Sequence, residues 1–120
     1  MAKGAVLYTD GTYEEKEFKQ LSDMQAAVDG LIEPIGMYDY FGDGVCQGYV
    51  NEEGLLKQLS FNGVASALSF MFGNAPKIVG NMIVLGITDK HGNDTDIPQD
   101  ILGFIKRVCG NRVKLEAEYV

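Results

Sequence analysis

Residues 78–88 read Ile-Val-Gly-Asn-Met-Ile-Val-Leu-Gly-Ile-Thr, and they give the strongest signal for the architecture of the chain. The stretch is nearly continuously apolar, rich in β-branched residues and free of charge. A segment of this kind is typical of a central strand that is buried on both faces. The glycines at positions 80 and 86 predict bulges or close backbone approaches within it. We therefore expect this strand to lie inside the sheet.

Three helices are predicted around this strand. The first begins at Ser22, which has capping-box spacing to the glutamine three residues later. The second runs from about 63–72 and is capped by Asn62, with apolar residues recurring at helical spacing. The third begins around Asp96 and ends at Gly110, and its apolar residues form a broad buried stripe.

Seven strands complete the prediction. Asp10 and Gly11 mark the turn of an N-terminal hairpin. The last predicted strand alternates apolar and charged residues, which indicates that one of its faces is exposed to solvent. We therefore expect a single α+β domain over residues 1–120, with a mixed, mostly antiparallel sheet and the order β-β-α-β-β-β-α-β-α-β. The predicted strands cover residues 5–8, 12–18, 35–41, 45–50, 55–61, 78–88 and 112–120.

The charge distribution limits the partners. Ten Lys and Arg against seventeen Asp and Glu give a net charge of −7. Residues 1–53 hold eleven acids and three bases, whereas residues 54–88 hold two lysines and no acid. An acidic chain is a poor binder of duplex nucleic acid and of anionic membranes. An anionic small molecule is repelled least by the middle third and by the basic residues near the C-terminus, which are Lys106, Arg107, Arg112 and Lys114.

The residues give little support for catalysis. His91 is the only histidine, and it lies in a polar turn where a solvated side chain is the ordinary expectation. Cys46 and Cys109 have no candidate base beside them in the sequence. They are predicted to be reduced, packed thiols, with a disulfide as the alternative. The aspartates within residues 94–100 lack the full ligand pattern of a calcium loop. We therefore predict no enzymatic activity, no cofactor and no metal.

Four residues are candidates for holding an anionic ligand. The helix behind Asn62 would offer free backbone N–H groups, and Phe61 could stack on a base. The alternative for this pair is an ordinary helix cap beside a core phenylalanine. Arg107 and Arg112 are the only arginines, and arginine suits bidentate recognition of phosphate. The alternative for Arg107 is that it complements the negative end of its helix.

Four segments of the chain, taken in order, resemble small proteins of phages and conjugative elements, most of which have no assigned function. These segments are an extended piece ending in an Asp-Gly hairpin (6–12), a Val-Asn-Glu-Glu-Gly turn (50–54), an asparagine-led helix (61–66) and a closing Val-Gly strand (78–86). The resemblance spans most of residues 4–102. Its motifs are structural rather than chemical.

A small acidic phage protein of this kind is also similar to the first-described Thoeris anti-defence proteins. This resemblance implies a sponge that binds a cyclic ADP-ribose isomer between the protomers of a homo-oligomer and sequesters it without cleaving it. Phe61 with Asn62, and Arg107 with Arg112, match the types of side chain that hold the ligand in that family. We therefore expect an anti-defence protein of the host cytoplasm, since no secretory signal is evident. The alternative is an acidic protein-binding inhibitor that mimics DNA.

Overall fold

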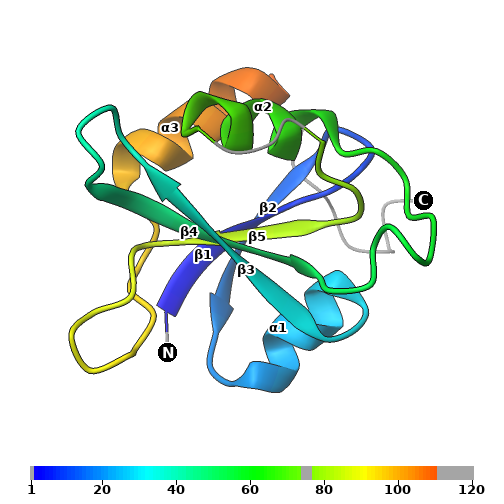
Figure 1. Ribbon diagram of the computed structural model, residues 1–120, viewed down its shortest axis with the longest axis horizontal. Helices are drawn as coiled ribbons and strands as arrows, with labels where there is room; N and C mark the ends of the chain where they lie inside the picture. Colours follow the sequence, from blue (N-terminus) through cyan, green and yellow to red (C-terminus); the bar gives the residue numbers. More distant parts are fainter. Residues whose placement is uncertain (1, 74–76, 111–120) are drawn as a thin grey trace.

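The computed structural model describes residues 2–73 and 77–110, and Figure 1 shows how the elements are arranged. Within these residues, five strands form one sheet in the order β2-β1-β5-β4-β3, and all neighbouring strands are antiparallel. The predicted α+β class and its three helices are confirmed. The elements are β1 (Ala2–Leu7), β2 (Tyr13–Phe18), α1 (Leu21–Val28), β3 (Ile32–Tyr38), β4 (Gly44–Asn51), α2 (Gly63–Met71), β5 (Met82–Leu85) and α3 (Gln99–Cys109).

The helices cover the two faces of the sheet unequally. Figure 1 shows α2 and α3 together on one face, and α1 alone on the other. Leu68 of α2 and Ile105 of α3 belong to the larger of two apolar clusters, which also holds Met37 and Cys46 from the sheet. The smaller cluster lies beneath α1 and includes Val28. Because α1 is the only described helix on this face, part of the sheet beside it is left uncovered, and a hollow can form there.

The centre of the sheet is built as residues 78–88 predict, although the strand is shorter. All four residues of β5 are buried, and β5 pairs with both β1 and β4. Outside β5, Val79 forms only an isolated bridge with Phe61. Gly80 adopts a positive φ of 76°. A side chain at Gly86 would collide with the backbone oxygen of the residue at position 96, so the predicted close approach occurs there.

The N-terminal hairpin turn lies where Asp10 and Gly11 predict it. The backbone N–H of Tyr8 donates to the carbonyl of Thr12 at 2.9 Å, and that of Gly11 donates back to the carbonyl of Tyr8 at 3.1 Å. Gly11 has a φ of 86°, a left-handed conformation that glycine adopts without strain. The turn thus fixes the register in which Leu7 pairs with Tyr13.

The strand predicted over residues 55–61 is wrong. Residues 52–58 form consecutive turns, and the segment joins the sheet only through the isolated bridge at Phe61. The physical reason is that the backbone N–H groups of residues 57, 58 and 59 donate to carbonyls within residues 53–55, so they are not available for pairing with a strand. Leu55 and Leu56 are instead exposed. The strand predicted over residues 112–120 lies outside the described residues.

Two helix starts differ from the prediction. Helix α1 begins at Leu21, one residue before the predicted cap, because the carboxylate of Asp23 accepts backbone N–H groups from Lys19 and Gln20. Helix α3 begins at Gln99 instead of near Asp96. The Asp96 carboxylate does not cap this helix, because it accepts the backbone N–H of Lys3 at 2.8 Å and so ties the preceding loop to β1.

Candidate functional site

Asn62 caps α2, as predicted, but its side chain is committed to the fold. The amide oxygen accepts the backbone N–H of Ala65 at 3.0 Å. The amide nitrogen donates to the carbonyls of Leu7 and Gly80, both at 2.9 Å. The side chain is fully buried, and both of its donor hydrogens are used. Asn62 therefore joins α2 to the sheet, and a ligand cannot reach it without rearranging the core.

The other predicted ligand residues do not gather around Asn62. Phe61 is 56% exposed, so it is not the core phenylalanine of the alternative interpretation. Arg107 is exposed in the last turn of α3. Arg112 lies outside the described residues. The best-formed hollows of the described surface include five that Phe61, Asn62 and Arg107 do not line. Phe61, Asn62 and Arg107 therefore do not come together in any of these hollows.

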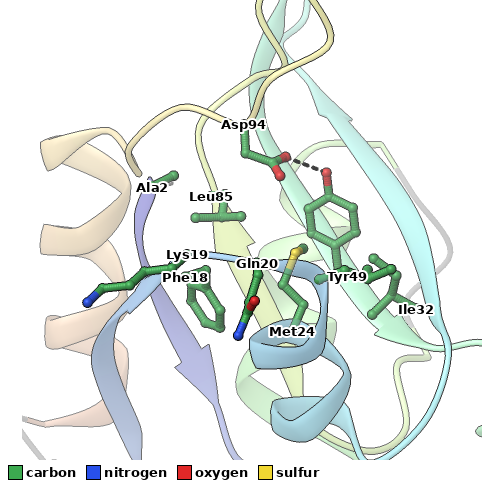
Figure 2. A pocket seen from close by; sticks show the side chains of 10 residues that line it. Ala2, Phe18, Lys19, Gln20, Met24, Ile32, Tyr49, Leu85 and Asp94 are labelled. Carbon is green, nitrogen blue, oxygen red and sulfur yellow. Dashed lines mark hydrogen bonds between the residues drawn. The ribbon is translucent and has the colours of Figure 1, made fainter.

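A hollow of about 210 Å³ opens on the face of the sheet that α1 only partly covers. We call it the α1 hollow, and Figure 2 shows its lining side chains. Its wall is apolar where the sheet and α1 meet, and polar where the β2–α1 link and the loop after β5 approach. The lining residues are Ala2, Phe18, Lys19, Gln20, Leu21, Met24, Ile32, Tyr49, Leu85 and Asp94.

The sheet register places the aromatic wall of this hollow. Cys46, Gly48 and Val50 of β4 are buried, and Cys46 and Val50 belong to the large cluster under α2 and α3. Because side chains alternate along a strand, Tyr49 points to the opposite face, where it packs against the cluster beneath α1. It pairs with Ile83 of the buried central strand. The ring is therefore held by a rigid part of the sheet.

The phenol of Tyr49 makes the main polar contact in the hollow. Its hydroxyl donates to Oδ1 of Asp94 at 2.6 Å, as Figure 2 shows. Burial, and then this hydrogen bond, raise the pKa of Tyr49 above its usual value. The phenol therefore stays protonated at neutral pH and orients the carboxylate. Asp94 thus offers a fixed hydrogen-bond acceptor at the mouth of an apolar hollow.

Two further polar side chains line the hollow across from Tyr49. Gln20 offers both amide donors and an amide acceptor. Among the described residues, Lys19 is the only cation that lines this hollow, and Figure 2 shows its side chain extending away from Tyr49. A ligand whose ring contacts Tyr49 would therefore meet positive charge only at its outer end.

The sequence did not identify these residues as a site. Asp94 lies in a polar turn, where an aspartate is ordinarily a solvated loop residue. The sequence held no clear signal for Tyr49, because residues 45–50 (Val-Cys-Gln-Gly-Tyr-Val) do not alternate between apolar and polar types. Nor does a signal exist for Gln20 or Asp94, which lie 74 positions apart in the chain and meet only through the fold.

The two cysteines and the histidine lie away from the α1 hollow. Cys46 and Cys109 are both buried thiols, as predicted. Burial raises the pKa of the Cys46 thiol to about 12, with the negative charge of Asp100 adding to the effect. His91 is exposed in a turn that the Asp89 carboxylate holds through two backbone N–H groups. Among the described residues, no cluster of three or more His, Cys, Asp or Glu side chains could hold a metal ion.

The fold and the hollow define a small α+β protein with a concave, polar-rimmed cavity on one face of an antiparallel sheet. The chain belongs to the family described as Domain of unknown function (DUF3846), whose model matches residues 2–109. No curated protein and no solved structure matches the chain. None of the helices within residues 2–73 and 77–110 is long and apolar enough to cross a membrane.

Proposed function

We propose that the protein is a binding protein that captures a small nucleotide-like molecule and holds it without cleaving it. The observation that carries the proposal is the α1 hollow, where an apolar wall stands beside a carboxylate oriented by the Tyr49 hydroxyl. A nucleobase has the matching chemistry, because its ring is flat and apolar on its faces and its edge carries N–H donors. Asp94 would accept such a donor, and Gln20 can pair with either kind of edge group.

The size of the hollow decides how much of the ligand it holds. A volume of about 210 Å³ lies below the roughly 300–1,000 Å³ of pockets that enclose whole drug-sized ligands. The hollow therefore suits one ring system, with the rest of the molecule outside it. The phosphate end would then lie toward Lys19, away from the Asp94 carboxylate. The arrangement separates the anionic part of a nucleotide from the acidic part of the site.

The side chains near the ring of the bound ligand support the proposal that the ligand is held without being cleaved. Tyr49 stays protonated and so cannot serve as a base at neutral pH. Cys46 is buried and belongs to the cluster on the other side of the sheet. The ligand that the resemblance to Thoeris anti-defence proteins implies, a cyclic ADP-ribose isomer, belongs to the same nucleotide class. We extend the proposal to an anti-defence sponge in the host cytoplasm that acts as a homo-oligomer.

The proposal is tested by a capture-and-release experiment on the full chain. The protein is incubated with cyclic ADP-ribose isomers and a panel of other cyclic nucleotides, removed by filtration, and then denatured by heat. Recovery of an intact nucleotide supports the proposal. Recovery of an altered nucleotide would show an enzyme instead, and failure to deplete any nucleotide would reject nucleotide binding altogether.

The residues predicted from the sequence remain a competing location for the ligand. Replacing Phe61, Arg107 or Arg112 with alanine should leave capture unchanged if the ring binds in the α1 hollow. A loss of capture in these variants, with capture retained in Asp94→Asn, would move the site to the positions that the sequence indicated. The two locations are thereby distinguished by the same assay.

A protein-binding inhibitor that mimics DNA is the second candidate. The observation that favours it is the edge strand β2, where Glu15 and Glu17 are exposed with Lys16 between them. Lys106 of α3 forms an ion pair with Glu15 at 3.5 Å, which neutralises part of this edge. This candidate predicts that no nucleotide is depleted and that the chain competes with duplex DNA for binding to a basic DNA-binding protein.

A further inference from the structure

A second surface gathers exposed apolar side chains from two elements that are distant in the sequence. The turn between β3 and β4 projects beside the end of α2 (Figure 1). Tyr40 is 96% exposed and Phe41 is 84% exposed at the tip of this turn. Monomeric proteins rarely leave such a set of large apolar groups in contact with water unless a partner covers it. We call this surface the tip patch, and it consists of Tyr38, Tyr40, Phe41, Phe70 and Met71.

The tip patch rests on a well-formed turn. Oδ1 of Asp39 accepts the backbone N–H groups of Phe41 and Asp43, both at 2.9 Å, and the N–H of Asp39 donates to the carbonyl of Asp43. The rings of Tyr40 and Phe41 meet edge to face, with centroids 5.5 Å apart and planes at 89°. The turn therefore holds the backbone that carries these two rings in a defined conformation.

A hollow of about 480 Å³ lies between the turn and the end of α2. Tyr38 and Tyr40 line it on the strand side, and Phe70, Met71 and Phe72 line it on the helix side. An aromatic or aliphatic side chain of a partner could enter it, as anchor residues do at protein interfaces. It shares no lining residue with the α1 hollow.

The two charged side chains of the segments that form the tip patch are both negative. Within residues 36–47 the only charged side chains are Asp39 and Asp43, and residues 58–73 carry no charge at all. A partner with arginine or lysine next to apolar residues would pair its cations with these carboxylates and place them over the faces of the exposed rings. A second copy, a nucleic acid or an anionic membrane would instead bring negative charge against negative charge.

We propose that the tip patch is a docking surface for a basic, partly apolar protein segment. An apolar side chain of the segment fills the hollow beside Phe70, and its arginine or lysine side chains contact the rings and carboxylates of the turn. This surface goes beyond the proposed nucleotide capture and does not depend on it. It gives the protein a second, separate means of association.

The experiment uses the full chain and three synthetic peptides with the same leucine spacing, whose intervening positions are arginine, glutamine or glutamate. Binding is measured by fluorescence anisotropy. We expect the arginine peptide to bind most tightly and Phe41→Ser to weaken it at least about tenfold, as loss of a buried aromatic anchor does. Asp43→Asn should weaken it about two- to fivefold, in proportion to one exposed ion pair. Leu56→Ser, at a residue 83% exposed outside the patch, is the matched control and should have no effect.

Several results would overturn the proposal. The arginine peptide could bind Phe41→Ser as tightly as the original protein, or the glutamate peptide could bind as well as the arginine peptide. Sedimentation could show a self-association that Phe41→Ser abolishes, which would make a second copy the occupant. Binding of an oligonucleotide duplex or of anionic phospholipid vesicles that depends on Phe41 would equally reject a basic protein partner. The substituted residues are exposed, so the melting temperature of each variant should stay unchanged. That measurement confirms that each variant is folded.

Discussion

At the scale of single residues, Asn62 is the most consequential side chain in the core. It was predicted as a helix cap and as a ligand-binding residue, and the structure accounts for the cap alone. An asparagine before a run of small residues indicates a helix start from sequence. The two bonds from its amide nitrogen join it to residues 55 and 18 positions away. Such long-range partners leave no trace in local sequence.

Replacing Asn62 with alanine should destabilise the protein strongly. The variant loses the helix cap, which stabilises a protein by about 1 kcal/mol. It also leaves two buried carbonyls with one hydrogen-bond partner fewer, and an unsatisfied buried carbonyl costs about 1–3 kcal/mol of stability. We expect the free energy of unfolding in urea to fall by roughly 3 kcal/mol or more. Asn93→Ala, at an exposed position, is the control and should change it by less than about 0.5 kcal/mol. Similar values for the two variants would contradict the role given to Asn62.

Tyr49 gives a pH-dependent prediction. Its pKa in the folded protein is raised by burial and by the hydrogen bond to Asp94. The stabilisation is therefore complete below the ordinary tyrosine pKa of about 10 and is lost as the pH rises above that value. Between about pH 9 and pH 11, the free energy of unfolding should fall more steeply for the original protein than for Tyr49→Phe. Parallel curves would show that the phenol carries no such stabilisation.

At the scale of elements, most of the architecture follows from local signals. The Asp10-Gly11 turn, the strand over residues 45–50 and the continuous apolar run before Gly86 were predicted correctly. The segment over residues 55–61 failed because its apolar side chains resemble a strand, whereas its backbone N–H groups bond to carbonyls a few residues earlier in consecutive turns. The apolar pattern alone does not distinguish these two conformations. The start of α1 failed for a smaller reason, since the capping box forms between Gln20 and Asp23 and not at Ser22.

The junction between β5 and the following loop is the tightest element contact near the α1 hollow. A Cβ atom at Gly86 would overlap the carbonyl oxygen of Asp96 and the hydroxyl of Thr95. Gly86→Ala should therefore displace the loop that carries Asp94. We expect a lower melting temperature together with weaker nucleotide capture. Gly63→Ala meets only an ordinary contact with the Phe61 ring at 3.8 Å, so it should be neutral or slightly stabilising. Equal melting temperatures for the two variants would contradict this account.

At the scale of the whole molecule, the site could not be predicted from the sequence. The lining of the α1 hollow comes from β1, β2, the link to α1, α1 itself, β3, β4, β5 and the loop after β5. Only the assembled sheet brings these pieces together. The negative charge, in contrast, is visible in composition, and it bears on both proposals. It requires that an anionic ligand keep its phosphates away from Asp94, and it favours a basic partner at the tip patch.

The two association sites make opposite predictions for matched variants. Asp94→Asn should reduce nucleotide capture and leave binding of the arginine peptide unchanged. Asp43→Asn should do the reverse, because the hollows beside the two residues share no lining side chain. Capture is measured by filtration and peptide binding by anisotropy on the same preparations. If either variant impaired both activities while keeping its melting temperature, the two sites would not be independent.

The central claim is that an oriented Asp94 beside the Tyr49 ring retains an intact nucleotide. The most direct measurement compares equal quantities of the original protein, Asp94→Asn and Asp43→Asn. Each is incubated with cyclic nucleotide, separated by filtration and heated, and the amount and mass of the released nucleotide are determined. We predict intact nucleotide from the original protein and from Asp43→Asn, and at least about tenfold less from Asp94→Asn, in line with the loss of a hydrogen bond to a charged group. Equal release from all three proteins, or no nucleotide from any of them, would contradict the claim.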